Sequence, residues 1–227
     1  KTSFDFQNRV DTPSPADDRG LVDGMLTPKA ALLGAIALMA AGAALGLLLA
    51  FKNRVPALLP LGAAGCALAW FYSGGAGYKY RALGDIGIFL AFGPLIMTGT
   101  ALIQTGYFVP EALWASIPAG LLITAILHAN NMRDLRSDSA SEFRTLAGML
   151  GLGASKRLYR ALIFAPYVFS FTFGSVWPAA FCALSVPLAV RLNERAAREE
   201  FSPLVPETAK LVAVYGLLLT AGLYFAG

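Results

Sequence analysis

Long stretches without a charged residue alternate with short polar segments along this chain. A helix that crosses a bilayer needs about 20 apolar residues, because the hydrocarbon layer is about 30 Å thick and each helical residue rises about 1.5 Å. The pattern therefore predicts an all-α fold, a polytopic membrane helical bundle with seven spans. The expected ranges are 30–51, 55–78, 86–110, 112–132, 155–173, 176–192 and a last helix from near Glu207 to residue 227.

The run 161–190 is uncharged but too long for one span and too short for two. Gly174, Ser175 and Pro178 interrupt it, so we expect two helices that meet there. The basic residues near position 156 then lie at one end of the first of these helices and extend toward the interface.

Composition agrees with a membrane protein. Of the 227 residues, 56% are hydrophobic and 14% are charged, whereas an average soluble domain is about 25% charged. This excludes an intrinsically disordered chain and argues against an ordinary soluble domain. The net charge of +4 comes from basic clusters between apolar runs, which favours a lipid bilayer over nucleic acid as the partner.

The distribution of basic residues predicts the orientation. If the spans alternate, residues 1–29, 79–85, 133–160 and 191–210 share one side and carry 16 of the 18 Lys and Arg residues. Lys52 and Arg54 are left on the other side. By the positive-inside rule the longer loops are cytoplasmic, and the protein is an integral membrane protein, most simply of the cell (inner) membrane.

Acidic residues gather in the same cytoplasmic segments. Asn130, Asp134 and Asp138 recur every four residues, so a helix would place all three on one face. Two carboxylates at this spacing repel each other unless a cation lies between them, and Mg²⁺ is commonly held by one or two carboxylates together with substrate phosphates. Residues 1–29 contain five further Asp residues. The acids therefore predict two Asp-rich patches that hold Mg²⁺ on a diphosphate.

Three segments then resemble one known family. Residues 129–138, A-N-N-M-R-D-L-R-S-D, are similar to the second aspartate motif of the UbiA superfamily of intramembrane prenyltransferases. The closest form is N-N-x-R-D-x-x-x-D, that of the 1,4-dihydroxy-2-naphthoate branch of menaquinone biosynthesis. Residues 2–11 with 17–23 resemble that branch's first motif, and residues 72–75 with 78–85 resemble its third conserved-looking loop.

The resemblance covers essentially the whole chain and implies a fold of nine helices. Residues 1–227 then form a single prenyltransferase domain that lacks the first two helices. Two positions depart from the family pattern. Lys1 stands where the first motif opens with Asn, and residues 142–145, E-F-R-T, replace Gly-Lys-x-Thr.

The resemblance also implies an activity, the Mg²⁺-dependent transfer of a polyprenyl group from prenyl diphosphate to an aromatic acceptor such as 1,4-dihydroxy-2-naphthoate. The metal ligands implied are Asp5, Asp11, Asp134 and Asp138. The catalytic residues implied are Asp5, Asp134, Asp138 and Lys79, and the substrate-binding residues are Asp18, Arg19, Tyr72, Asn130, Asn131 and Arg133.

Other functions stay open at this point. A UbiA-type enzyme could use another acceptor, such as 4-hydroxybenzoate or homogentisate, and a non-catalytic paralogue could bind prenyl lipid. A transporter would place its ionisable residues near the middle of the membrane, whereas these acids lie at the ends of the apolar runs. The single histidine, His128, is expected to form hydrogen bonds at a helix end rather than to bind a metal.

Overall fold

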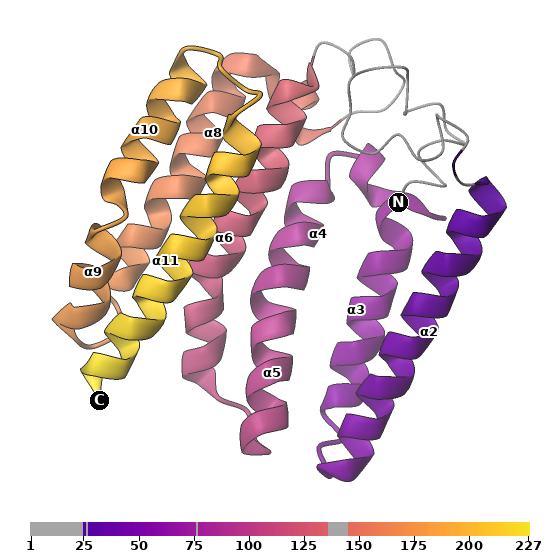
Figure 1. Cartoon of the computed structure of the whole chain (residues 1–227). Helices are drawn as coiled ribbons and strands as arrows, with labels where there is room; N and C mark the ends of the chain where they lie inside the picture. The colour runs from indigo at the N-terminus through magenta and orange to yellow at the C-terminus, as the bar shows by residue number, and fades with distance from the viewer. Residues whose placement is uncertain (1–24, 26, 76, 136–144) are drawn as a thin grey trace.

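The computed structural model describes residues 25, 27–75, 77–135 and 145–227, which fold into helices joined by short loops (Figure 1). The helices run alternately up and down between two ends of a bundle. They are α2 (Pro28–Lys52), α3 (Leu58–Ser73), η1 (Tyr78–Tyr80), α4 (Gly84–Leu90), η2 (Ala91–Leu95), α5 (Ile96–Thr105), α6 (Pro110–Arg133), α8 (Leu146–Ser170), α9 (Val176–Ala183), α10 (Val186–Ala197) and α11 (Leu204–Ala226).

The all-helical membrane fold is confirmed, and each of the seven predicted ranges corresponds to helix. Among the described residues, four helices are long and apolar enough to cross a membrane: α2, the rod Gly84–Thr105, α6 and α11. The bent pair α9–α10 would make a fifth span. The helix α3 is shorter, with 16 residues, so the count of seven spans stays a prediction.

Helix α8 begins nine residues earlier than the predicted start at 155, at Leu146. The Thr145 hydroxyl accepts a hydrogen bond from the Gly148 amide at 3.1 Å and caps the first turn. Gly151 then kinks the helix with φ of +72°, a conformation that suits glycine. Lys156 lies inside α8, not at its end, and bonds the carbonyl of Ala197.

The predicted helix 176–192 is two helices, α9 and α10, which meet at an angle of 52°. Pro187 lacks an amide hydrogen and so cannot continue the helical ladder through the junction. The Ser185 hydroxyl donates to the Cys182 carbonyl at 2.7 Å and satisfies part of the broken turn. The predicted break before this pair is confirmed, since α8 ends at Ser170 and Gly174 has φ of +73°.

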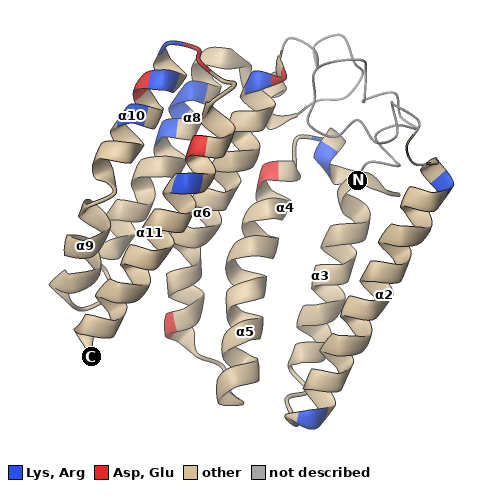
Figure 2. Cartoon of the chain, in the orientation of Figure 1, with Lys and Arg blue, Asp and Glu red and all other residues tan. Residues whose placement is uncertain are grey.

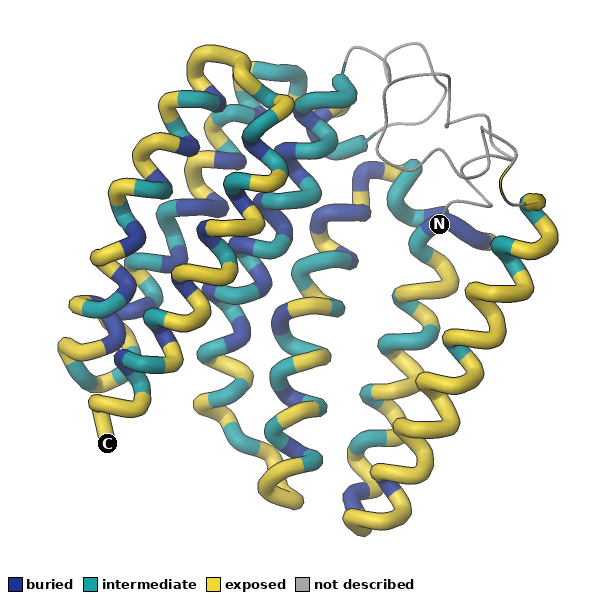
Figure 3. The backbone as a smooth tube through the Cα atoms, in the orientation of Figure 1, coloured by how far each residue is buried: buried dark blue, intermediate teal, exposed yellow. Residues whose placement is uncertain are grey.

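The core of the bundle lies around α6. Its buried residues pack against α8 on one side and α11 on another, while α4 and η2 cover a third side. Figure 3 shows that burial concentrates in these helices, whereas α2 and much of α3 are exposed. The fully buried side chains at the centre are Leu122, Ala125, Ala129, Tyr159, Ile163 and Leu211.

The rod from α4 to α5 approaches α6 closely because both have glycine at the crossing. A Cβ atom added to Gly93 would lie 3.1 Å from the Cα atom of Gly120 and 3.1 Å from the Ser116 carbonyl oxygen. Helices in lipid associate through such close packing of small residues. The crossing lies in the π-helical turn η2, where Pro94 interrupts the regular ladder.

Charged side chains gather at one end of the bundle, where α6 ends and α8 and α11 begin (Figure 2). We call this the motif end. The opposite, far end carries Lys52 in the last turn of α2, Arg54 just after it, and Glu111 in the first turn of α6. Most charged side chains of the described residues thus share one end of the bundle, as alternating spans require.

Candidate functional site

The last turn of α6 carries four predicted site residues: Asn130, Asn131, Arg133 and Asp134. Asp134 is the C-cap, and its amide donates to the Asn130 carbonyl at 3.0 Å. The hydrogen bond from Asn130 Nδ2 to Asp134 Oδ2, at 3.0 Å, confirms that these two side chains share one face. α6 ends at Arg133, and the third member of the predicted face, Asp138, lies outside the described residues, so its place on that face stays a prediction.

Arg133 neutralises Asp134 locally. Its Nε atom lies 2.8 Å from Asp134 Oδ1, and its Nη2 atom lies 3.1 Å from Oδ2. The same Nη2 atom donates to Asn130 Oδ1 at 2.9 Å. A carboxylate at a helix C-terminus faces the negative end of the helix dipole, so it favours a neighbouring cation. Arg133 supplies one, and both side chains are about one-third exposed or less.

A second group of predicted residues, Tyr72 and Lys79, lies at the end of α3 and in η1. The Lys79 ammonium is 4.8 Å from the ring centroid of Tyr80 and 5.7 Å from that of Tyr72. Both distances are within the range of cation–π attraction. The prediction that Tyr72 and Lys79 belong to one site is therefore consistent with their contact.

Tyr78 anchors the loop that carries Lys79. Its hydroxyl donates to the Leu68 carbonyl at 2.9 Å, and its ring packs edge-on against Tyr72 with centroids 5.4 Å apart. A backbone carbonyl can only accept, so the Tyr78 phenol is the donor in this bond. The ring also contacts Gly87, where a larger residue would clash.

The start of α4 joins the two groups. A Cβ atom added to Gly84 would lie 3.4 Å from Lys79 Cβ and 3.8 Å from the Tyr72 hydroxyl. The next residue, Asp85, accepts a hydrogen bond from Asn131 Nδ2 at 3.2 Å. The lysine loop and the end of α6 are thus neighbours across one turn of α4.

Sequence reasoning missed a buried pair behind these residues. Asp85 Oδ2 and His128 Nδ1 are 2.7 Å apart, and His128 Nε2 lies 3.2 Å from the Ser155 carbonyl oxygen. His128 is fully buried and Asp85 nearly so. The expectation that His128 forms hydrogen bonds is confirmed. Its partner Asp85 belongs to the loop 78–85 that resembles the family's third motif, but no local pattern links two residues that are 43 positions apart.

Several predicted site residues cannot be placed. Asp5, Asp11, Asp18, Arg19 and Asp138 lie outside the described residues. Of the four predicted metal ligands, Asp134 therefore lies within the described residues. The described part of the chain holds no cluster of three or more His, Cys, Asp or Glu suited to a metal. The oxygen donors at the end of α6 are of the kind that Mg²⁺ binds, and the Mg²⁺ site stays a prediction.

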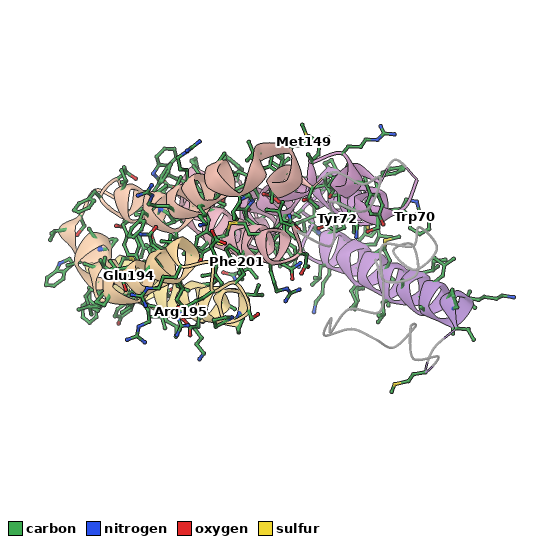
Figure 4. The ribbon with its side chains drawn as sticks, turned by 90° about the horizontal axis from the view of Figure 1, so that it is seen from above. Trp70, Tyr72, Met149, Glu194, Arg195 and Phe201 are labelled. Atoms are coloured by element: carbon green, nitrogen blue, oxygen red, sulfur yellow. The ribbon has the colours of Figure 1, made fainter. Side chains whose placement is uncertain are left out.

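The basic residues of α10 are a separate group. Arg195 forms ion pairs with Glu200 at 3.0 Å and with Glu207 at 3.0 Å. Viewed from above, Tyr72 and Arg195 lie well apart across the bundle (Figure 4). The Arg195 group therefore ties α10 to α11 and does not belong to the candidate site.

An apolar helical bundle with acidic, amide and basic side chains at one end defines the class as a polytopic helical membrane protein. The sequence profile of the UbiA prenyltransferase family matches residues 11–200. The chain belongs to the UbiA prenyltransferase family, and this membership supports a prenyltransferase.

Curated relatives agree with this assignment. The chain is 38% identical over 224 residues to the UbiA prenyltransferase domain-containing protein 1 homolog of Drosophila melanogaster, covering 96% of this chain and 62% of that protein. It is 36% identical over 237 residues to UbiA prenyltransferase domain-containing protein 1 of Homo sapiens, covering 99% and 68%. The chain thus spans roughly two thirds of the length of these relatives, and less than two thirds of the Drosophila protein.

Proposed function

We propose that this protein transfers a polyprenyl group from prenyl diphosphate to an aromatic acceptor, with 1,4-dihydroxy-2-naphthoate as the acceptor, in menaquinone biosynthesis. Family membership supports prenyl transfer. The N-N-x-R-D-x-x-x-D form of residues 130–138 supports this acceptor branch by resemblance. The observation that carries the proposal is the polar group at the end of α6, placed beside the lysine loop at one end of an apolar bundle.

The bundle suits the two halves of a prenyl diphosphate. The polyprenyl tail would lie along apolar helices, and the diphosphate would lie at the motif end. Lys79 and Arg133 would bind diphosphate oxygens from η1 and α6, and Arg19 would do so from the first motif. Asp18 would contribute a further substrate contact from that motif. The stacking of Lys79 on Tyr80 and Tyr72 holds its ammonium in place before the ligand arrives.

Asp134, together with Asp5, Asp11 and Asp138, would hold Mg²⁺. When bound, the cation supplies positive charge that stabilises the departing diphosphate. Asn130 keeps Arg133 and Asp134 in a fixed arrangement, so these groups need little reorganisation during the reaction.

The proposed reaction replaces the carboxylate of the acceptor with the prenyl group. The allylic C–O bond breaks, and the diphosphate leaves with its electron pair. The ring carbon that bears the carboxylate forms a bond to the prenyl carbon, and the carboxylate leaves as carbon dioxide. The apolar bundle excludes water from the allylic cation during this step.

We further propose that the motif end faces the cytoplasm. The support is the excess of Lys and Arg in the loops on that side, as the positive-inside rule requires.

The test is an acceptor panel. The protein in membranes would receive Mg²⁺, a radiolabelled prenyl diphosphate and, in separate reactions, 1,4-dihydroxy-2-naphthoate, 4-hydroxybenzoate or homogentisate. We expect a lipid-soluble labelled product with the naphthoate. Product with another acceptor alone would transfer the proposal to that acceptor, and binding of prenyl diphosphate without any product would indicate a non-catalytic paralogue.

A further inference from the structure

The buried Asp85–His128 pair lies behind the candidate site and has no role in the reaction proposed above. It links three helices: Asp85 on α4, His128 on α6 and the Ser155 carbonyl on α8. A polar group in a bundle within lipid costs free energy unless its partners are present. Each polar side-chain atom of this pair has a partner within hydrogen-bonding distance, so the pair forms a complete network.

Chemistry fixes the direction of two hydrogen bonds in the network, the one to the Ser155 carbonyl and the one from Asn131. The Ser155 carbonyl can only accept, so His128 must carry a proton on Nε2. The proton between His128 Nδ1 and Asp85 Oδ2 then belongs to either atom. In both cases Asp85 Oδ1 has no proton and acts as an acceptor.

Asn131 completes the chain of bonds. Because Asp85 Oδ1 can only accept, Asn131 must turn its Nδ2 donor toward α4, where the distance is 3.2 Å. The other end of the amide, Oδ1, accepts no hydrogen bond from the described residues. Asn131 lies three residues before Asp134, which places both on one side of the helix.

We infer that Asp85 and His128 are positioning residues that fix the side-chain amide of Asn131, so that its oxygen faces the diphosphate-cation site beside Asp134. Asn131 then serves the site as a hard oxygen acceptor for a cation or its bound water, and not as a donor to phosphate. This inference rests on the proposed function for the identity of the ligand. It differs from the role of Asn130, whose two amide atoms are bonded to Arg133 and Asp134.

Two substitutions of one residue separate positioning from charge. In Asp85→Asn, the new amide donates to His128 Nδ1 and its oxygen still accepts from Asn131, because the Ser155 carbonyl keeps the proton on Nε2. The orientation of Asn131 therefore survives although the acid is lost. In Asp85→Leu, no acceptor remains, and the Asn131 amide is free to turn.

The readout is binding, independent of transfer. Each variant in lipid nanodiscs would be titrated with Mg²⁺ at a fixed concentration of a non-cleavable prenyl diphosphate analogue, and the unfolding temperature would report binding. We expect Asp85→Leu to raise the half-saturating Mg²⁺ concentration by about tenfold, the lower end of the effect of losing a residue that orients a metal ligand. We expect Asp85→Asn to leave it within about twofold, since each bond is retained.

Two further variants keep the test decisive. Asn131 is partly exposed, so we expect Asn131→Ala to fold even if Asp85→Leu does not. It should raise the half-saturating Mg²⁺ concentration as Asp85→Leu does. Tyr215→Phe removes a buried hydrogen bond of 2.7 Å to the Pro166 carbonyl and should lower stability without changing the Mg²⁺ dependence.

The inference is overturned if Asn131→Ala leaves the Mg²⁺ dependence unchanged, if Asp85→Asn and Asp85→Leu shift it equally, or if wild type shows no Mg²⁺-dependent stabilisation. A wild type that binds with the expected variant pattern but transfers no prenyl group would contradict the proposed function and leave this inference standing.

Discussion

Two helices of nearly equal length, α2 and α6, differ in what surrounds them. Both are apolar enough to cross a membrane, yet none of the most hydropathic 18-residue stretch of α2 is buried in the bundle, against 50% of that of α6. Between Lys29 and Lys52, α2 carries no polar residue. In contrast, α6 buries Ser116, Thr124 and His128.

The difference shows that polar residues, more than hydropathy, mark the central helix of a membrane bundle. Lipid accepts apolar side chains on every face of a helix, whereas a polar group is tolerated where neighbouring helices or the site satisfy it. The polar residues of α6 lead toward its last turn, where Asn130, Asn131 and Asp134 form the candidate site.

The largest expected effect is at Asp134, at the motif end of α6. Asp134→Asn removes the charge that pairs with Arg133 at 2.8 Å and one predicted cation ligand. We expect prenyl transfer to fall on the order of 100-fold or more, as when a preorganised electrostatic group is lost. The measurement is the initial rate with saturating prenyl diphosphate and acceptor.

Glu111→Gln is the matched control on the same helix. Glu111 is exposed at the far end of α6, so the same carboxylate-to-amide change should leave the rate unchanged. Equal losses in the two variants would show that the end of α6 has no special role.

The next effect is at Lys79. Lys79→Met keeps a long side chain but removes the ammonium held over Tyr72 and Tyr80. We expect the KM for prenyl diphosphate to rise about tenfold, which corresponds to about 1.4 kcal/mol of binding free energy. Lys52→Met, at the last residue of α2 on the far end, is the control, and a similar rise in KM there would count against a diphosphate contact at Lys79.

A packing variant compares α6 with α2 directly. Gly120→Ala on α6 brings a Cβ atom to 2.9 Å from Phe89 Cδ2 and 3.2 Å from the Gly93 Cα atom, whereas the space around Gly42 on α2 is open to 4 Å. We expect Gly120→Ala to lower the free energy of unfolding by about 1–3 kcal/mol. Gly42→Ala should change it by about 0.5 kcal/mol or less. Thermal unfolding in the same lipid tests both, and equal effects would contradict the central position of α6.

The smallest effect is at the ion pairs between α10 and α11. Arg195→Gln loses the pairs with Glu200 and Glu207, which are partly exposed, so we expect a loss of about 1 kcal/mol in stability. Arg198 is 3.8 Å from Glu194 and well exposed, and Arg198→Gln should have no measurable effect. Neither variant should change prenyl transfer, and a lost activity in Arg195→Gln would extend the site to α10.

Much of the fold could be predicted from the sequence. The uncharged run 30–51 corresponds to α2 (Pro28–Lys52), and 112–132 corresponds to α6 (Pro110–Arg133), within two residues at each end. These two runs end where charge begins, and charged side chains are costly within the hydrocarbon layer. The predicted start of α8 at 155 is wrong because a lysine does not mark the end of this helix: Lys156 lies inside α8 and bonds the Ala197 carbonyl and the Glu199 carboxylate.

The candidate site was predicted in part. The spacing of Asn130 and Asp134 predicts their contact, since one helical turn joins them. The pair Asp85–His128 could not be predicted because it depends on the crossing of α4 and α6, which the glycine contact at Gly93 and Gly120 sets. No local periodicity encodes such a crossing.

Photo-crosslinking of the bound substrate is the measurement that tests the central claim most directly. A prenyl diphosphate analogue with a photoreactive group in its first isoprene unit would be irradiated with the protein in membranes, with and without Mg²⁺, and the labelled peptides identified by mass spectrometry. We predict Mg²⁺-dependent labelling of the motif-end portions of α3, α4 and α6, suppressed by excess unlabelled prenyl diphosphate. Labelling confined to α2 or to α9–α10, and insensitive to Mg²⁺ and competitor, would contradict a diphosphate site at the end of α6.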